Sequence, residues 1–180
     1  DGWTITETLF KYHAACYLTH AAIESTLRLR TSIDPDDLVA ATVVVNPGLL
    51  DVCAIERPTT GLEGKFSLTG TTAMALLGLD TTDPKTFVDA TLQRDDVQRL
   101  LRKVRVETDD SLGQTQSVLH LEDSSQKRLT AEYDSGIPVR DLDAQGEKLQ
   151  RKAQGVASLS AQKLADLQNL ANRPSLQSLL

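Results

Sequence analysis

The amino-acid sequence predicts an α+β fold, in which a small antiparallel or mixed sheet packs against helices and a C-terminal helical tail follows. Three observations support this class. Apolar residues recur at helical spacing in some segments, whereas β-branched residues cluster in others. Aromatic residues make up only 4% of the 180 residues, so the core must be built mainly from Leu, Val, Ile and Ala. Lys, Gln, Ala and Leu dominate from residue 139 onward, a composition typical of helices.

The first element is a helix predicted over residues 14–30. One face carries four residues at helical spacing: Cys16, His20, Ile23 and Leu27. A second apolar stripe lies beside it: Ala15, Leu18, Ala22 and Leu29. Two stripes predict a helix that is buried over much of its circumference.

A buried strand is predicted over residues 38–45, which are rich in β-branched side chains. Further helices are predicted at residues 67–79, 85–92 and 95–103. Further strands are predicted at residues 104–108, 114–121 and 128–133. We expect these last strands to form an antiparallel meander, which can include the first strand.

The composition divides the chain into two parts. Residues 1–138 form the predicted α+β unit, a lid-type domain, and residues 139–180 form the predicted helical tail. Ser160 is a suitable N-cap for the last helix. The apolar residues of that helix are Leu164, Leu167 and Ala171. Because this stripe needs a partner surface, we expect the tail to pack on a helical domain that is missing here, and the start at Asp1 without Met agrees with a segment of a longer protein.

Charge and cysteine content exclude several functional classes. The net charge is −6, and no Lys/Arg-rich block offsets it, so nucleic-acid binding is not expected. Cys16 and Cys53 have no disulfide-framework spacing and are interpreted as free thiols in a reducing compartment. No apolar run is long enough to span a membrane, and no signal peptide is apparent. We therefore expect a cytoplasmic protein.

The first group of candidate functional residues lies between Lys11 and His20. Lys11 precedes the predicted helix, where its ammonium could help to bind a carboxylate at the helix N-terminus, although a solvated surface lysine is the commoner outcome. Cys16 and His20 could form two ligands of a zinc site or a nucleophile pair. The further ligands and the third group that these sites need are not evident, so burial of both residues in the core, with His20 bonded to a carbonyl, is the favoured interpretation.

The second group surrounds the start of the helix at residues 67–79. Backbone N–H groups and the hydroxyls of Ser67, Thr69 and Thr71 could hold an anionic oxygen there. The phosphate-binding order G-x-x-x-x-G-K-[ST] is absent. The alternative is that Ser67 simply caps the helix and Phe66 packs as a hydrophobic staple.

Together, these two groups resemble the C-terminal region of the MmgE/PrpD family. The first family pattern is a Lys, an aromatic residue, a Cys or His, and a His four residues later, matched by Lys11-Tyr12-His13-Ala14-Ala15-Cys16 and His20. The second is matched by Glu63-Gly64-Lys65-Phe66-Ser67-Leu68 and by Ala73-Met74-Ala75-Leu76. The order and spacing of the motifs extend the resemblance over nearly the whole chain.

The resemblance implies the C-terminal portion of a lyase, with a dehydratase of propionate metabolism as the first expectation. Its substrate would be a small di- or tricarboxylate such as 2-methylcitrate, bound between this lid and the helical domain, with no metal and no cofactor. Lys11, Cys16 and His20 would be catalytic residues. His13, Lys65 and Ser67 would bind substrate. The full-length enzyme would be a homodimer, and the isolated chain would be inactive.

Two departures from the family pattern affect this expectation. Ala14 stands where relatives carry Pro, and Thr69-Gly70 stands where many carry an aromatic residue. Cys16 in place of His argues against the family's cis-aconitate decarboxylases. Two alternatives remain open: an epimerase or isomerase of the same family, and a non-catalytic carboxylate-binding or interaction module.

Overall fold

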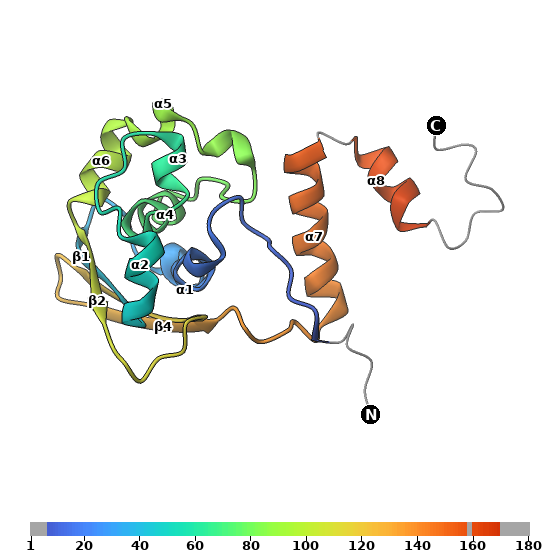
Figure 1. Cartoon of the computed structure of the whole chain (residues 1–180). Coiled ribbons are helices and arrows are strands. Elements are labelled where there is room, and N and C mark those ends of the chain that lie inside the picture. Colours follow the sequence, from blue (N-terminus) through green and yellow to red (C-terminus); the bar gives the residue numbers. More distant parts are fainter. Residues whose placement is uncertain (1–6, 158–159, 170–180) are drawn as a thin grey trace.

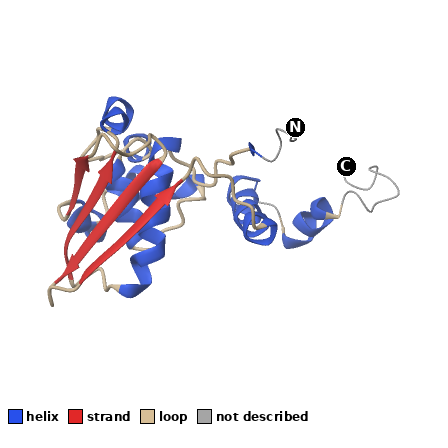
Figure 2. Ribbon diagram, turned by 90° about the horizontal axis from the view of Figure 1, so that it is seen from below, coloured by secondary structure: helices blue, strands red, loops and turns tan. Residues whose placement is uncertain are grey.

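A computed structural model describes residues 7–157 and 160–169 of the chain. Its centre is a four-stranded mixed sheet in the order β2-β1-β3-β4 (Figure 2). The strands are β1 (Leu38–Val45), β2 (Val104–Thr108), β3 (Gln116–Asp123) and β4 (Arg128–Asp134). β1 runs parallel to β2 and antiparallel to β3, and β3 runs antiparallel to β4. The predicted α+β class is therefore confirmed.

The predicted meander is wrong in one respect, because β2 and β3 are not neighbours. β1 lies between them and pairs with both, with Val43 opposite Val106 on one side and Leu119 on the other. The apolar sequence of β1 suits this central place. β2 carries Arg105 and Glu107 on exposed positions, which suits an edge strand.

The helices gather on one face of the sheet (Figure 2). Their ranges are α1 (His20–Leu29), α2 (Leu50–Cys53), α3 (Gly61–Gly64), α4 (Leu68–Leu76), α5 (Asp89–Leu92) and α6 (Asp95–Leu101). Short 3₁₀ turns connect them: η2 (Tyr17–Thr19), η3 (Arg30–Ser32), η4 (Pro47–Leu49) and η5 (Pro84–Thr86). α1 packs on β3, β4 and α4, and α4 packs on β2 and α6. The hydrophobic core lies between these helices and the inward side chains of the strands.

α4 is the most deeply buried helix of this layer, since every residue from Leu68 to Leu76 is buried. Ser67 caps its N-terminus by accepting a hydrogen bond from the Gly70 N–H. Gly78 follows its C-terminus with φ of 71°, a conformation that favours glycine. The alternative interpretation, in which Ser67 caps this helix, is therefore confirmed.

The first predicted helix begins later than expected. α1 starts at His20, and Cys16 has an extended conformation with φ of −56° and ψ of 139°. The backbone N–H of Ala14 donates to the Thr81 carbonyl, and that of Cys16 donates to the Lys65 carbonyl. Because ψ of Cys16 lies far from the helical value, no helical turn can include this residue, and the two N–H donors bind other segments instead. Cys16 and His20 therefore do not share one helical face, and that prediction is wrong.

Two tail helices, α7 (Leu142–Ala157) and α8 (Ala161–Gln168), follow the sheet. Figure 1 shows α7 beside the α/β unit, with the N-terminal segment that leads to α1 running between them in this view. The backbone N–H of Lys163 donates to the Ser160 hydroxyl, which confirms the predicted N-cap. The side chains of Leu164 and Leu167, and all of Ala171, lie outside the described part. The expected packing of this tail on another domain stays a prediction.

Neither α7 nor any other helix within residues 7–157 and 160–169 combines the length and the apolar character that crossing a membrane requires.

Candidate functional site

A buried polar cluster lies where the segment before α1, α1 itself and α7 meet. Its centre is Glu24 on α1, whose carboxylate Oε1 lies 2.6 Å from Lys148 Nζ and 3.4 Å from His13 Nε2. His13 is buried, and its Nδ1 lies 2.8 Å from the Thr81 hydroxyl. The cluster therefore joins residues 13–24 to Thr81 and to Lys148, which are distant in the sequence.

The electrostatics of this cluster favour its charged form. Burial alone would raise the pKa of Glu24, but hydrogen bonds from His13 and Lys148 outweigh it and hold the pKa at about 2. Burial would lower the pKa of Lys148, but the Glu24 carboxylate outweighs that effect and raises it. Both shifts agree on an ion pair that persists across the physiological pH range.

His20 lies beside this cluster, and only 2% of its surface is exposed. Burial, followed by the positive charges of His13 and Lys11, lowers its pKa to about 3, although a hydrogen bond donated to the Ala15 carbonyl opposes the shift. Its Nε2 has no partner among the described residues. His20 is therefore a neutral imidazole near pH 7, and the predicted bond to a nearby carbonyl is confirmed.

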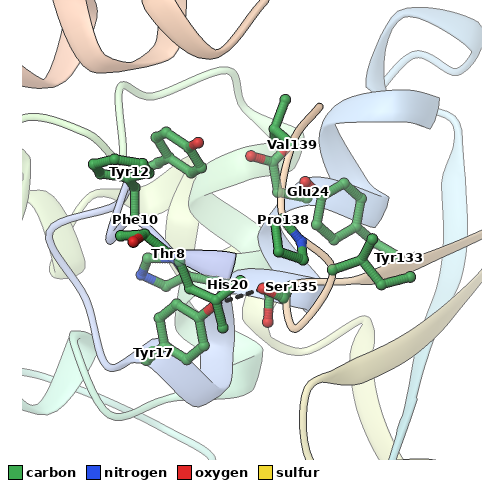
Figure 3. A pocket seen from close by; sticks show the side chains of 12 residues that line it. Thr8, Phe10, Tyr12, Tyr17, His20, Glu24, Tyr133, Ser135, Pro138 and Val139 are labelled. Atoms are coloured by element: carbon green, nitrogen blue, oxygen red, sulfur yellow. Dashed lines mark hydrogen bonds between the residues drawn. The ribbon is translucent and has the colours of Figure 1, made fainter. Parts of the chain in front are cut away.

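A small cavity of about 20 Å³ adjoins His20 (Figure 3). The rings of Tyr17 and His20 have centroids 4.9 Å apart and are tilted by 41°. The Tyr17 hydroxyl donates a hydrogen bond to the Ser135 carbonyl at 2.5 Å. The rest of the wall comes from the N-terminal segment, from Glu24 and Tyr133, and from the linker after β4. The cavity is large enough for about one water molecule, which is far too small for a substrate.

A larger cleft of about 430 Å³ opens on the other side of the cluster, between α1, residues 78–82 and α7. Its lining carries both signs of charge: Glu24, Arg30, Asp80, Lys148 and Arg151. Its volume falls in the range of small-molecule sites.

Three lysines come together near this junction. Burial lowers the pKa of Lys152, and repulsion from the ammonium groups of Lys11 and Lys65 adds to this, while Asp80 and Asp83 oppose it. Lys11 is exposed and Lys65 is half-buried, with its Nζ 5.9 Å from the centre of the Phe87 ring. Lys152 is half-buried on α7, and its Nζ donates to the Thr82 carbonyl at 3.4 Å. Lys11, Lys65, Asp80 and Asp83, from separate segments, thus all act on Lys152.

The hydroxyls at the start of α4 are already bonded within the fold. Ser67 Oγ donates to the Ile55 carbonyl at 2.5 Å and accepts from the Gly70 N–H at 2.9 Å. Thr69 donates to the Glu56 carbonyl, and Thr71 donates to the Ser67 carbonyl. This arrangement favours the capping role of Ser67. Its predicted contact with substrate stays a prediction.

Cys16 and Cys53 are free cysteines that influence one another electrostatically. Cys53 is buried, whereas Cys16 is half-buried. Burial, together with the charge and the thiol of Cys16, raises the pKa of Cys53 to about 12. No group of three or more His, Cys, Asp or Glu residues in the described part is arranged to hold a metal ion.

Three residues of the site were missed from the sequence: Glu24, Lys148 and Lys152. Glu24 had a usable signal, because a lone carboxylate four residues after His20 interrupts a helix that is otherwise apolar on two stripes. Lys148 and Lys152 are four residues apart and therefore share one face of α7. Nothing in the local sequence shows which surface that face contacts.

Residues 13–172 match the family model described as the MmgE/PrpD C-terminal domain. A search of curated proteins gives no significant match.

Proposed function

The chain belongs to the MmgE/PrpD family as a C-terminal domain, and we propose that it forms the lid side of the active site of a lyase, a dehydratase acting on a small di- or tricarboxylate such as 2-methylcitrate. The residues of this domain bind carboxylate groups and stabilise negative charge. A helical domain elsewhere in the full-length protein completes the site and supplies the remaining acid and base groups.

The observation that carries this proposal is the convergence of Lys11, Lys65 and Lys152. Burial, and then repulsion from Lys11 and Lys65, lowers the pKa of Lys152 against the opposing charges of Asp80 and Asp83, so both ammonium groups lie within electrostatic reach of Lys152. Gathering like charges is unfavourable in the free protein, and a bound anion with several carboxylates removes the penalty. A protein of net charge −6 that concentrates cations at one place has a surface suited to acidic substrates.

In the proposed reaction, a base removes the proton next to a substrate carboxylate, and the electron pair spreads onto that carboxylate as an enediolate. The hydroxyl on the neighbouring carbon then leaves as water after it receives a proton from an acid. Lys11 and Lys65 stabilise the enediolate charge, because preorganised cations act most strongly where charge develops. Cys16, five residues after Lys11 and half-buried, is a further candidate catalytic residue in this proposal.

His13 and His20 act mainly by positioning in this proposal. His13 binds Thr81 and Glu24, which holds the segment that carries Lys11 against α1. His20 stays neutral and supports the same segment through the Ala15 carbonyl. The neutral form keeps a further positive charge away from Lys11, which lies close enough to lower the pKa of His20.

The test uses the full-length protein and the variants Lys11→Ala and Lys65→Ala. Deuterium exchange at the substrate carbon and product formation are measured with 2-methylcitrate, citrate, cis-aconitate and iminodisuccinate. Each variant should lower kcat/KM by about 10²-fold, the typical effect of removing one group that stabilises an oxyanion. Lys163→Ala is the matched control, because Lys163 is exposed on α8.

The outcomes separate the competing functions. Wild-type rates in both variants would remove these lysines from the site. Exchange of the substrate proton without loss of water would support an epimerase of the same family. Binding of tricarboxylates without any exchange would support a carboxylate-binding module and contradict the lyase.

A further inference from the structure

The two cysteines are brought together by the backbone on either side of them. The Cys16 N–H donates to the Lys65 carbonyl at 2.8 Å, and Ala54, next to Cys53, forms an isolated β-bridge with Ser67. The segment of residues 65–67 therefore brings the two cysteines close together, although 36 residues separate them in the sequence. Cys16 also contributes to the raised pKa of Cys53, as a neighbouring group does.

The two thiols differ in their access to solvent. Cys53 is 2% exposed at the end of α2, whereas Cys16 is only half-buried. An oxidant that reaches the pair therefore meets Cys16 first, with Cys53 directly behind it. This is the arrangement of a reactive thiol beside a resolving thiol.

We propose that Cys16 and Cys53 form a reversible redox site, in which a peroxide oxidises Cys16 and Cys53 converts the product into a disulfide. The Cys16 thiolate attacks one oxygen of hydrogen peroxide, the O–O bond breaks, and Cys16 becomes a sulfenic acid while hydroxide leaves. The Cys53 sulfur then attacks the Cys16 sulfur, the S–O bond breaks, and water leaves. Two thiols are oxidised to one disulfide, and one peroxide is reduced to two waters.

The electrostatics of the pair support the second step. The Cys16 charge is one of the causes that raise the pKa of Cys53. A sulfenic acid at Cys16 is neutral at the start of the reaction, so that contribution is lost once oxidation has occurred. Burial, the largest cause, continues to raise the pKa of Cys53, but oxidation of Cys16 removes the further contribution of its charge.

The consequence for activity rests on the proposed function. A bond between Cys16 and Cys53 ties the segment that follows Lys11 to the end of α2. The bond would hold the Cys16 side chain at Cys53, where it could no longer reach substrate, and it would restrain the segment that carries Lys11. Oxidation should therefore inactivate the enzyme, and a thiol reductant should restore it.

The test treats the full-length protein with hydrogen peroxide, blocks remaining thiols with N-ethylmaleimide and maps tryptic peptides by mass spectrometry. We expect peptide 12–28 linked to peptide 31–65, with the loss of two hydrogens, and recovery of both free peptides after dithiothreitol. In Cys53→Ala, Cys16 should instead be trapped by dimedone as a sulfenic acid. In Cys16→Ser, Cys53 should stay reduced.

Two results would overturn the redox site: both cysteines still alkylated by the maleimide after wild-type protein has been oxidised, or Cys16 passing to the sulfinic acid at the same rate with and without Cys53. Both readouts are independent of turnover, so they stand even if the lyase assignment fails. A separate arm adds citrate or cis-aconitate before peroxide. Slower linkage would place Cys16 in the carboxylate site, and unchanged linkage would contradict only that placement.

Discussion

Lys148 and Glu24 form an ion pair across 124 positions of sequence, with Nζ and Oε1 2.6 Å apart, and this contact joins α7 to α1. The Lys148 ammonium also lies 5.1 Å from the centre of the Tyr12 ring and 5.5 Å from that of Tyr133. A paired charge in such surroundings contributes more to a specific geometry than to net stability. The pair therefore decides where α7 sits.

Glu24→Gln should loosen α7. The substitution leaves the half-buried Lys148 without its anion and replaces the charged acceptor of His13 by a neutral amide oxygen, which should lower the free energy of local opening by about 1–3 kcal/mol. Hydrogen exchange of the α7 amides, followed by mass spectrometry, measures this directly. Glu147→Gln is the control, since Glu147 is exposed on the same helix. Equal exchange in both variants would contradict the role of the pair.

Stability should fall with acidification because of His20. Its pKa is about 3 in the folded state and near 6.5 for a solvated imidazole, so the unfolded chain binds the proton first. The stabilising contribution is complete above about pH 6.5 and is lost as the pH falls toward 3, by about 2 kcal/mol between pH 7 and pH 5. His20→Gln should flatten this slope in urea unfolding, whereas His120→Gln, exposed on the sheet, should keep it. If the His20 variant keeps the wild-type dependence of unfolding free energy on pH, His20 is not its cause.

Ser67→Ala should reduce stability even if substrate binding is unchanged. The variant loses the cap of α4 and the bond to the Ile55 carbonyl, a cost of about 1–2 kcal/mol. Chemical unfolding gives the loss, and tricarboxylate titration of the same variant gives the affinity. Ser124→Ala is the control, because Ser124 is an exposed turn residue. A stable variant with weakened binding would restore Ser67 as a substrate ligand.

Two glycines should respond oppositely to replacement by alanine. Gly78 has positive φ, and a Cβ there would collide with the Arg30 guanidinium, so Gly78→Ala should cost about 1–3 kcal/mol. Gly146 lies in α7 with nothing near its Cβ position, so Gly146→Ala should stabilise that helix by about 0.5–1 kcal/mol. Thermal unfolding tests the first and hydrogen exchange of α7 tests the second. The same sign of change for both would contradict the prediction.

The parts of the fold that were predictable from the sequence are those with local causes. β1 is a run of β-branched residues, and α4 carries its cap at Ser67 and its stop at Gly78, so both were placed within a few residues. The pairing of β1 with β2 has no local signal, because hydrogen bonds between strands depend on the whole chain. The start of α1 was misplaced because Ala14 and Cys16 donate to distant carbonyls, which periodicity does not reveal.

The candidate site was predictable to a similar extent. Lys11 and Lys65 were proposed from their motifs, and their interaction with a common neighbour supports that pairing. The common neighbour, Lys152, was not found, since its relevance depends on how α7 docks. The contact between Cys16 and Cys53 was equally hidden, because each cysteine is held through backbone bonds to residues 65–67 rather than through any spacing of its own.

The central place of β1 has a consequence for how the chain assembles during synthesis. β1 ends at Val45, its parallel partner begins at Val104 and its antiparallel partner begins at Gln116. At least 58 residues must therefore leave the ribosome before either neighbour can bond to it, as residues 46–103 separate β1 from β2. Until then, an apolar strand with two open edges is the segment most prone to pair with another nascent chain. Early packing of α1 and α4 should limit that risk, so variants that weaken α4 are expected to lower the yield of soluble protein more than its final stability.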